Sequence, residues 1–535
     1  MANTAEINKN IPSQAPKGGK MPAAIPYIVG NEAAERFNFY GLRAILATFI
    51  AAQFYHFKIG GDAAVNATAE ATANQQAHDF VALCYLTPLI GAMLADWFWG
   101  KYKTILYLSI VYLVGNVVLA LSVDTQTAFM AGLAMVAIGT GGIKPCVSAN
   151  VGDQFDETNQ HLISKGFDAF YFSINLGSFF SILLIPYLKS HFSPAVAFAV
   201  PAFAMGLATL VFVSGSPKYV KVPPKGDSNK LVILLSSIVT LAFSYYLMKD
   251  GGVVLGSGGG MGPVLLTWGI MIAITALVLQ KWWFANPGNF VGINLFALTN
   301  GGFDAAVKRY GAETVVGIKS VWSVLAVFAF IPFFWALWDQ SNGNEWTMQA
   351  QHMDLHVLGF KMEAEQISVA NALLILVFIP IFSFGIYPGI EKLGIKVTPL
   401  RRIGAGFFVT ALSFVLSAMI QRWIDAGATP TIGWQLLAYV LLTAGEILVS
   451  ITGLEYAYTQ APPTMKSTIS ACWLVAVTMG NVFDSLVQNS IRNHGFFARF
   501  QGEGFFWFFS GACACAGIVF ALLTPFIKEK RYAAN

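Results

Sequence analysis

Apolar segments of about 20 residues, the length needed to cross a bilayer, recur along nearly the whole chain. Polar stretches interrupt them: a basic, proline-bearing stretch at 216–227, a glycine-rich turn at 256–260 and a mixed stretch at 285–316. This alternation predicts six membrane-spanning helices, then two, then six. The predicted spans are 24–54, 79–99, 104–122, 127–149, 166–188 and 194–215, then 230–248 and 263–284, then 318–340, 366–387, 401–422, 433–455, 466–490 and 504–527.

The six-two-six order predicts an all-α membrane protein with 14 transmembrane helices, arranged as two six-helix bundles with two extra helices between them. Two bundles joined by a polar linker are typical of the major facilitator fold, whose binding sites lie near the membrane midplane between the bundles. The expected divisions are an N-terminal tail at 1–23, an N-terminal bundle at 24–215, a linker with the extra helices at 216–317, a C-terminal bundle at 318–527 and a tail at 528–535.

Composition supports a membrane protein and excludes several other classes. Of the 535 residues, 56% are hydrophobic and only 11% are charged, whereas soluble domains carry about 25% charged residues. The net charge of +4 comes from scattered basic residues, which argues against a nucleic-acid partner. The five cysteines lie in apolar segments without a CxxC pair, so we expect buried packing residues rather than disulfides or metal ligands.

The positions of Lys and Arg predict the orientation in the membrane. Basic clusters mark cytoplasmic loops, and here every cluster falls on one side of the predicted spans, so both termini should face the cytoplasm. Residues 1–21 are polar, and we therefore expect the first span itself to direct insertion. The loops at 55–78 and 341–365 should lie outside, the first being Ala-, Asn- and Thr-rich and flexible. The clusters include Lys17 and Lys20, Lys101 and Lys103, Lys218, Lys221 and Lys225, Arg401 and Arg402, and Lys528, Lys530 and Arg531.

The first predicted span carries an unusual stripe of charge, formed by Glu32, Glu35, Arg36 and Arg43. Each such side chain costs roughly 2.5–3.5 kcal/mol at the bilayer centre. Helical spacing puts the four close to one face. We therefore expect the stripe to face the interior of a bundle or a water-filled cavity.

Acidic and basic side chains from both halves should meet at similar depth. Glu35 lies about 11 residues into the first span, or roughly 16 Å. Glu446 lies about 13 residues into the span at 433–455, or roughly 20 Å from the opposite face. Lys144, on the span at 127–149, should lie somewhat nearer the cytoplasm. Such a group of charges suits a zwitterionic solute.

Several motifs, taken together and in order, resemble those of the proton-coupled oligopeptide transporter family. Glu32-Ala33-Ala34-Glu35-Arg36-Phe37 resembles its ExxERF motif, and the stretch at 91–103 resembles the cytoplasmic loop signature of the major facilitator superfamily. Within that stretch Asp96 is expected to act as a gating or structural residue. The other matching stretches are 141–145 with 152–155, 170–178, 334–340, 445–446 and 453–462.

The resemblance implies a site for di- and tripeptides. It implies that the peptide carboxylate pairs with Arg36 and Lys144, with Tyr40 donating, and that the ammonium pairs with Glu446. Asn side chains both donate and accept hydrogen bonds, so Asn175 and Asn371 could bond the peptide amides. Ordinary helix packing stays an alternative for the aromatic residues. The expected substrate-binding residues are Arg36, Tyr40, Tyr85, Lys144, Asn175, Trp335, Asn371, Glu446, Ser450 and Trp473.

The resemblance also implies coupling to protons and an outer gate. His78 opens the stretch at 78–88, which resembles animal peptide transporters, where the matching His is linked to proton binding. We expect Arg43 to pair with Asp339 in an outer gate that protonation at His78 or Asp339 loosens. Which group carries the transported proton stays open, because coupled groups can share it. The expected proton-coupling residues are Glu32, Glu35, Arg36, His78 and Glu446.

Departures from the family pattern suggest a bacterial member with animal-like motifs, in the cell inner membrane. Phe39 and Asp339 stand where many bacterial members have Tyr and Glu, and the loop at 423–432 is too short for the large domain of animal members. Glu455 and Asp484 are interpreted as capping or helix-contact residues. We expect a monomer that needs no cofactor or metal and uses the proton gradient.

Three other functions compete with this interpretation. The nearest is a carrier of the same fold for nitrate, an amino acid or another small solute. A membrane-embedded enzyme would need a nucleophile–base pair or a metal motif such as HExxH, and neither occurs. A passive channel is disfavoured because opposite charges at the midplane would plug a pore.

Overall fold

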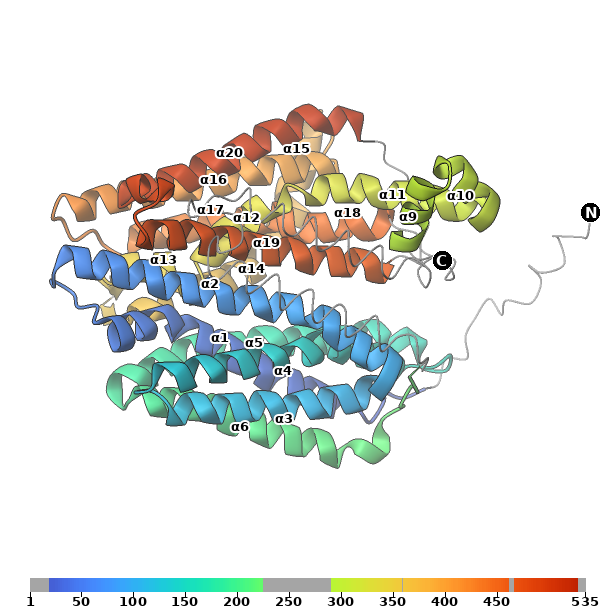
Figure 1. The fold of residues 1–535 in the computed structure, drawn as a ribbon, viewed down its shortest axis with the longest axis horizontal. Helices are drawn as coiled ribbons and strands as arrows, with labels where there is room; N and C mark the ends of the chain where they lie inside the picture. Colours follow the sequence, from blue (N-terminus) through green and yellow to red (C-terminus); the bar gives the residue numbers. More distant parts are fainter. Residues whose placement is uncertain (1–18, 225–289, 358, 461–465, 528–535) are drawn as a thin grey trace, which may run out of the picture.

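The computed structural model describes residues 19–224, 290–357, 359–460 and 466–527. Throughout this part of the chain the fold is nearly all helical (Figure 1). Its one sheet is a short antiparallel hairpin, β1 (His356–Val357) with β2 (Phe360–Lys361). The two predicted extra spans, 230–248 and 263–284, lie outside the described residues.

The first half folds as a bundle of six long helices that coincide with the first six predicted spans. A π-helical turn joins the second helix to the third, and short 3-10 turns stand before the fifth and after the sixth. The elements are α1 (Ile25–Tyr55), α2 (Ala63–Leu94), η2 (Ala95–Trp99), α3 (Gly100–Leu121), α4 (Gln126–Asp153), η3 (Gln160–Leu162), α5 (Ile163–His191), α6 (Pro194–Ser214) and η4 (Ser216–Lys218).

The second half is a similar bundle in which several predicted spans are interrupted helices. The chain bends by 42° between the helices on either side of 329–330. The elements are α9 (Phe290–Thr299), α10 (Gly302–Tyr310), α11 (Ala312–Phe328), α12 (Ile331–Gln340), α13 (Glu345–Ala350), η5 (Ala364–Ser368), α14 (Val369–Pro380), η6 (Ile381–Ile386), α15 (Tyr387–Lys392), α16 (Pro399–Asp425), α17 (Gly433–Glu446), η7 (Ile447–Ile451), α18 (Thr452–Gln460), α19 (Lys466–Arg492), η9 (Phe496–Phe500), α20 (Glu503–Leu523) and η10 (Thr524–Phe526).

Nine helical segments of the described residues are long and apolar enough to cross a membrane, or up to ten if the bent pair α11 and α12–α13 forms one span. The continuous segment Ala63–Leu121 counts once, although it contains both α2 and α3. Helix α1, with its four ionisable side chains, is not among them. Each of the twelve predicted spans within the described residues nevertheless coincides with a helix or an interrupted helix.

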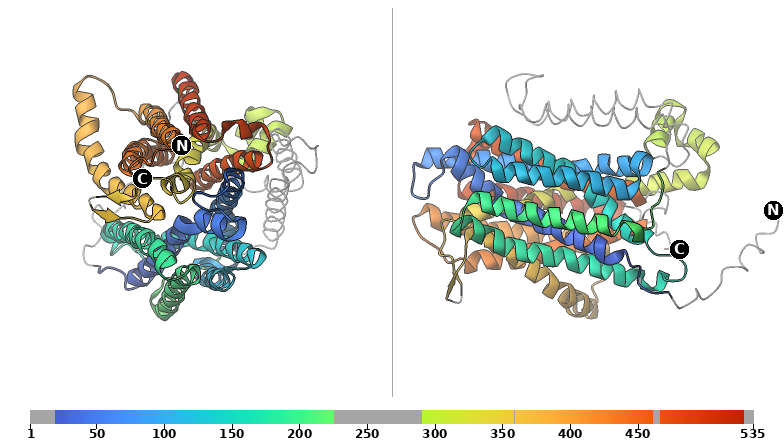
Figure 2. Two further views of the ribbon diagram at one scale, coloured as in Figure 1. Left: turned by 90° about the vertical axis from the view of Figure 1, so that its left-hand side faces the viewer. Right: turned by 90° about the horizontal axis from the view of Figure 1, so that it is seen from below.

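Each half has its own hydrophobic core. Figure 1 shows α1–α6 on one side of the molecule and α11–α20 on the other, and Figure 2 shows both groups end-on. The halves meet where α2 packs against α19 and where α5 packs against α14. We call the end at which α1 begins the base, and the end at which α1 ends and α2 begins the apex.

Small residues allow helices of the first bundle to approach closely. A Cβ atom on Gly91 of α2 would collide with the carbonyl oxygen of Gly141 on α4. In a bilayer, close backbone contact of this kind replaces the hydrophobic driving force that packs soluble helices. This contact brings Lys144, one turn further along α4, beside α2.

The prediction of a flexible loop at 55–78 is wrong, because α2 already begins at Ala63. Asp62 caps the helix by accepting hydrogen bonds from the backbone N–H groups of Ala64 and Val65. The following stretch is rich in Ala, the strongest helix former. Hydropathy did not reveal this extension, and His78 therefore lies within a long helix rather than at a helix start.

The prediction of an outside loop at 341–365 is also wrong in part. Residues 341–350 are all buried and include the short helix α13. Gly343 turns the chain inward with φ +89°, and a Cβ atom there would collide with the Arg43 carbonyl oxygen of α1. This stretch thus folds into the apex between the two halves.

Candidate functional site

Three charged side chains of α1 form one compact group. Arg36 Nε lies 2.8 Å from Glu32 Oε1, and Arg36 Nη2 lies 2.5 Å from Glu35 Oε2. Thr140 of α4 donates a hydrogen bond to the other oxygen of Glu35, at 2.7 Å. Both carboxylates are buried, with Glu35 at 0% exposure. Glu32 pairs with Arg36 at i, i+4 spacing and Glu35 pairs with the adjacent Arg36, so acids and base form a buried, internally paired cluster.

Lys144 of α4 differs from these groups because it forms no ion pair with any residue that the structure describes. Its Nζ lies 4.0 Å from the centroid of the Phe39 ring and 4.1 Å from that of Tyr85. It finds no hydrogen-bond acceptor among the described residues. Two aromatic faces stabilise an ammonium partly, which leaves its donors available to a carboxylate. Tyr40 lies next to this position, with its ring 5.4 Å from that of Phe39.

Glu446 is the corresponding acid of the second half. It ends α17 directly before the π-helical turn η7, a kind of distortion often found at functional sites. Asn371 of α14 donates to Glu446 Oε2 at 2.7 Å and to Thr443 Oγ1 at 3.1 Å. Ser450, within η7, is half-buried. No ion pair joins Glu446 to the first half in the part of the chain that the structure describes.

The aromatic candidates of the second half pack on one another. Trp335 of α12 and Trp473 of α19 are 8% and 9% exposed, and their ring centroids lie 6.0 Å apart. Trp335 also meets Trp338 at 5.2 Å. Such contacts suit either a pocket wall or ordinary helix packing. Asn175 of α5 is half-buried and donates to the Tyr171 carbonyl of its own helix at 2.9 Å.

The expected gate pair is present and buried at the apex. Arg43 Nη2 lies 2.5 Å from Asp339 Oδ1 and 3.0 Å from the Asp339 carbonyl oxygen. The residues are 2% and 0% exposed. Asn481 of α19 donates to the other carboxylate oxygen of Asp339 at 2.5 Å. This pair joins α1 of the first bundle to α12 of the second.

A second ion pair, which the sequence analysis missed, joins the halves on another side of the apex. Lys189 of α5 pairs with Glu365 of η5. Thr48 of α1 donates to Glu365 Oε1 at 2.8 Å and accepts from Lys189 at 3.1 Å. This contact, like Arg43 with Asp339, thus joins the two bundles at the apex.

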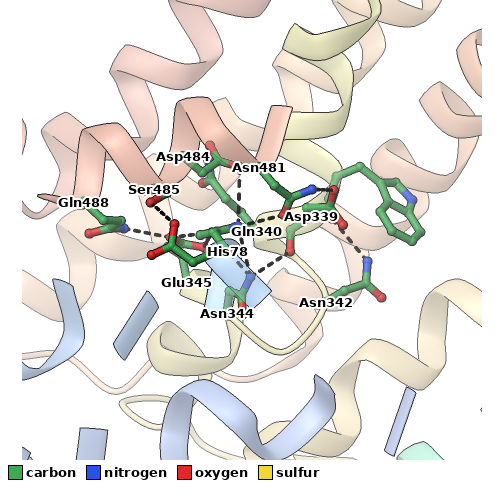
Figure 3. Close-up of polar contacts among 12 residues, drawn as sticks. His78, Asp339, Gln340, Asn342, Asn344, Glu345, Asn481, Asp484, Ser485 and Gln488 are labelled. Atoms are coloured by element: carbon green, nitrogen blue, oxygen red, sulfur yellow. Dashed lines mark hydrogen bonds and ion pairs between the residues drawn. The ribbon is translucent and has the colours of Figure 1, made fainter. Parts of the chain in front are cut away.

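His78 lies at the centre of a polar network between α2 and the second half (Figure 3). Its Nε2 lies 3.1 and 3.2 Å from the two oxygens of Glu345, and its Nδ1 lies 3.1 Å from Asn481 Oδ1. Asp484 Oδ2 lies 3.7 Å from the same Nδ1. Gln488 donates to Glu345 at 2.7 Å. Asp484, interpreted from the sequence as a helix contact, therefore belongs to this network.

A model of the POT family matches residues 102–500. The chain belongs to the POT family. Solute carrier family 15 member 2 of Danio rerio is 36% identical over 76% of this chain and 50% of that protein. Peptide transporter family 2 of Caenorhabditis elegans is 36% identical over 76% of this chain and 48% of that protein. The chain thus spans about half the length of the curated relatives it matches.

Solved POT family structures confirm the fold. The crystal structure of the POT family transporter PepTSo aligns with a TM-score of 0.76 and 36% identity, covering 95% of this chain and 99% of that one. A proton dependent oligopeptide (POT) family transporter aligns with a TM-score of 0.71 and 36% identity, covering 93% and 100%. The all-α fold and the family resemblance expected from the sequence are therefore confirmed.

The base carries the stretch that resembles the cytoplasmic loop signature. Asp96 lies exposed on η2 and forms no ion pair with the residues described here. Lys101, five residues later, instead binds Asp153 at the end of α4, with Nζ 2.7 Å from Oδ2. The charged contact at this turn of the POT fold thus involves a base of the motif rather than its acid.

Proposed function

We propose that this chain is a proton-coupled symporter that imports di- and tripeptides across a membrane by alternating access. Named relatives support the substrate class, because the Caenorhabditis elegans relative is a peptide transporter. One similar structure is that of a proton-dependent oligopeptide transporter, which supports the energy source. The function of the whole relatives is a proposal for this chain, which spans only about half their length.

The observation that carries the proposal is the opposition of charges between the two halves. Lys144 of the first bundle presents an ammonium without an acceptor among the described residues. Glu446 of the second bundle presents a carboxylate held by one amide, that of Asn371. A peptide is a zwitterion, so its carboxylate would bind Lys144 and Arg36 while its ammonium bound Glu446. Peptide binding would then draw the bundles together.

The other candidate residues have supporting roles in this proposal. Tyr40 would donate to the peptide carboxylate, and Asn175 and Asn371 would bond the peptide amides. The aromatic residues would form walls that accept many side chains, since an aromatic ring offers an apolar body and, in Tyr and Trp, a polar tip. The proposed wall residues are Tyr85, Trp335 and Trp473, with Ser450 at the edge of the site.

Proton coupling follows from the acids around Arg36. In the structure Arg36 is paired with Glu32 and Glu35. A proton on either acid would weaken that pairing and free Arg36 for the peptide carboxylate. No cofactor is needed, because each proton that falls through the membrane potential supplies about 2.3 kcal/mol per 100 mV. A monomer suffices, since both halves of the proposed site come from one chain.

The proposed orientation places the base in the cytoplasm and the apex outside, in a cell inner membrane. The basic loops at the base support it under the positive-inside rule. The two ion pairs at the apex, Arg43 with Asp339 and Lys189 with Glu365, would then hold the outer side closed. Opening and closing of this gate alternates with access from the cytoplasm.

Reconstituted vesicles with an inward proton gradient and a labelled dipeptide test the function. We expect uptake that collapses when a protonophore is added. Glu446→Gln should reduce uptake, whereas the matched change Glu455→Gln should not, because Glu455 is largely exposed and lies 3.8 Å from Arg402. Uptake insensitive to the protonophore would rule out symport. Nitrate uptake without dipeptide uptake would favour the rival carrier.

A further inference from the structure

Two acids near His78 have no role in the proposed peptide site. Glu345 of α13 and Asp484 of α19 flank the imidazole, and the three residues are 6%, 1% and 0% exposed. They contact His78 from the second bundle, whereas His78 belongs to α2 of the first (Figure 3). Any charge in this cluster therefore acts directly between the two bundles. The cluster is separate from Glu32, Glu35 and Arg36, which contact one another on α1.

The hydrogen-bond pattern indicates that the imidazole carries two N–H groups. Its Nε2 faces both oxygens of Glu345, which can only accept if the carboxylate is ionised. Its Nδ1 faces Asn481 Oδ1, and the orientation of that amide is fixed because Asn481 Nδ2 donates to Asp339 and to the Val477 carbonyl. When Glu345 is ionised, both nitrogens face acceptors, and a charged imidazole satisfies both.

Asn344 does not change this assignment. Its amide Nδ2 lies 3.4 Å from each ring nitrogen, at the limit of a hydrogen bond, and it donates to the Asp339 carbonyl at 3.3 Å. Because it is equally far from both nitrogens, it selects neither tautomer. The two shorter contacts, to Glu345 and Asn481, decide the protonation state.

Asp484 is the second place for a proton. Its Oδ1 accepts from Gln340 at 3.1 Å, but its Oδ2 has no hydrogen-bond partner in the described chain. A buried carboxylate oxygen without a donor is costly, and the group lowers that cost by taking a proton. Among the described residues, the ion pair that Oδ2 forms is with His78, at 3.7 Å, and His78 is already bonded to Glu345.

The charges that surround the cluster do not neutralise it. Arg43 is committed to Asp339, and Asp79, next to His78 on α2, accepts from Ser485 at 2.6 Å. No Lys or Arg of the described residues forms an ion pair with Glu345 or Asp484. With a neutral imidazole the cluster would carry two negative charges in a buried place. One proton on His78 and one on Asp484 make it neutral.

A cavity at the apex leads to this cluster. It has a volume of about 480 Å³, and both Glu345 and Gln488 line it. Glu70 and His352 line its outer part, 3.9 Å apart. Water in this cavity would bring protons to Glu345, which is the residue that contacts His78. The cluster is thus buried, but it lies next to a cavity at the apex.

We propose that His78, Glu345 and Asp484 form a proton-binding site that takes up two protons when the apex closes. A charged His78 attracts Glu345 across the bundle boundary, so its protonation tightens the apex. This sign is opposite to the expectation from the sequence, in which protonation of His78 loosens the gate. The proposal rests on the proposed proton coupling, for which it names a site outside the midplane.

Thermodynamic linkage gives a direct test. The logarithm of the closed-to-open ratio falls as pH rises, and the steepness of this slope equals the number of protons taken up on closure. Spin labels at Ile59 and Phe496 would report that ratio, as both side chains are exposed at the apex and belong to different bundles. The five native cysteines are first replaced. The protein is measured in lipid discs without peptide, over a range of pH.

The expected result is a stepwise loss of slope. Asp484→Asn and Glu345→Gln should each lower the slope by one proton, since the remaining acid and His78 form a neutral pair with a single proton. The double variant should lower it by two. Asp79→Asn, a matched change of the neighbouring acid on α2, should leave the slope unchanged. A double variant with the wild-type slope would overturn the proposal, as would an equal loss in Asp79→Asn.

The test also separates this site from the proposed function. If the slope falls as expected but the protein takes up no dipeptide, the proton site stands and the peptide assignment fails. If dipeptide uptake is proton-driven but the variants keep the wild-type slope, the assignment of the proton site fails while the proposed function stands. Thermal melting would reveal whether the double variant folds. If it does not, each single variant still tests the proposal by itself.

Discussion

Removing the charge of Asp339 should open the apex. Asp339→Asn leaves the Arg43 guanidinium, 2% exposed, without its anionic partner, because an amide oxygen accepts a hydrogen bond but carries no charge. Removing one partner of a buried ion pair destabilises the state that buries it by roughly 3–5 kcal/mol. Each 1.4 kcal/mol is about a tenfold change in an equilibrium constant. The cost applies only while Arg43 is buried. The closed-to-open ratio should therefore fall by roughly two to almost four powers of ten.

Alkylation of a single cysteine measures this change. Ser341→Cys replaces a fully buried side chain of the apex with one of similar size, in a protein without the native cysteines. A membrane-impermeant maleimide should react about a hundredfold faster in Asp339→Asn than in the parent. Adding Arg43→Gln should slow the reaction again, because it removes the unpaired charge. An unchanged rate in Asp339→Asn, or a faster one in the double variant, would refute the reasoning.

Three further predictions concern the midplane residues. Glu446→Gln should lower the preference for a free over an N-acetylated dipeptide by about 10- to 100-fold, because a hydrogen bond to a charged group contributes roughly 1.5–3 kcal/mol; competition for uptake measures this. Lys144→Met should keep the contacts with Phe39 and Tyr85 but raise the KM for dipeptides at least about tenfold. Glu35→Gln should abolish uptake driven by a proton gradient yet leave peptide counterflow intact, as measured in the same vesicles.

Specific outcomes would contradict each of these. An unchanged preference in Glu446→Gln would mean that the peptide ammonium binds elsewhere. An unchanged KM in Lys144→Met would mean that the free ammonium serves packing on the aromatic rings. Loss of counterflow in Glu35→Gln would indicate that Glu35 supports the structure rather than the coupling, since its contacts with Arg36 and Thr140 are also altered.

Hydropathy predicted the membrane helices well but not where they end. The predicted span at 79–99 falls on α2, yet that helix begins at Ala63. Hydropathy measures transfer into lipid, whereas helix formation at 63–78 depends on alanine propensity and on the Asp62 cap. The same limitation placed residues 341–350 in an outside loop. They are polar in sequence, but they are buried because they fill the space between the bundles at the apex.

Single residues of the candidate site were located from motifs, whereas their partners were not. Arg43 and Asp339 could be paired because both lie near the same end of predicted spans. Glu345 could not be assigned a partner from the sequence, because an acid in a predicted loop is normally solvated. Asp484 offered a signal that was not used: it lies within an apolar span, where the cost that singled out Glu32 to Arg43 also applies. The contact with His78 depends on how α2 packs against α19.

The central claim is that peptide and proton cross together, and it is tested most directly in reverse. Vesicles that contain a pH indicator are prepared without a proton gradient, and an inward gradient of a zwitterionic dipeptide with no net charge is imposed. The account predicts that the lumen acidifies as peptide enters, and that the Glu446→Gln protein acidifies it far less. Peptide entry without any change in luminal pH would contradict the account.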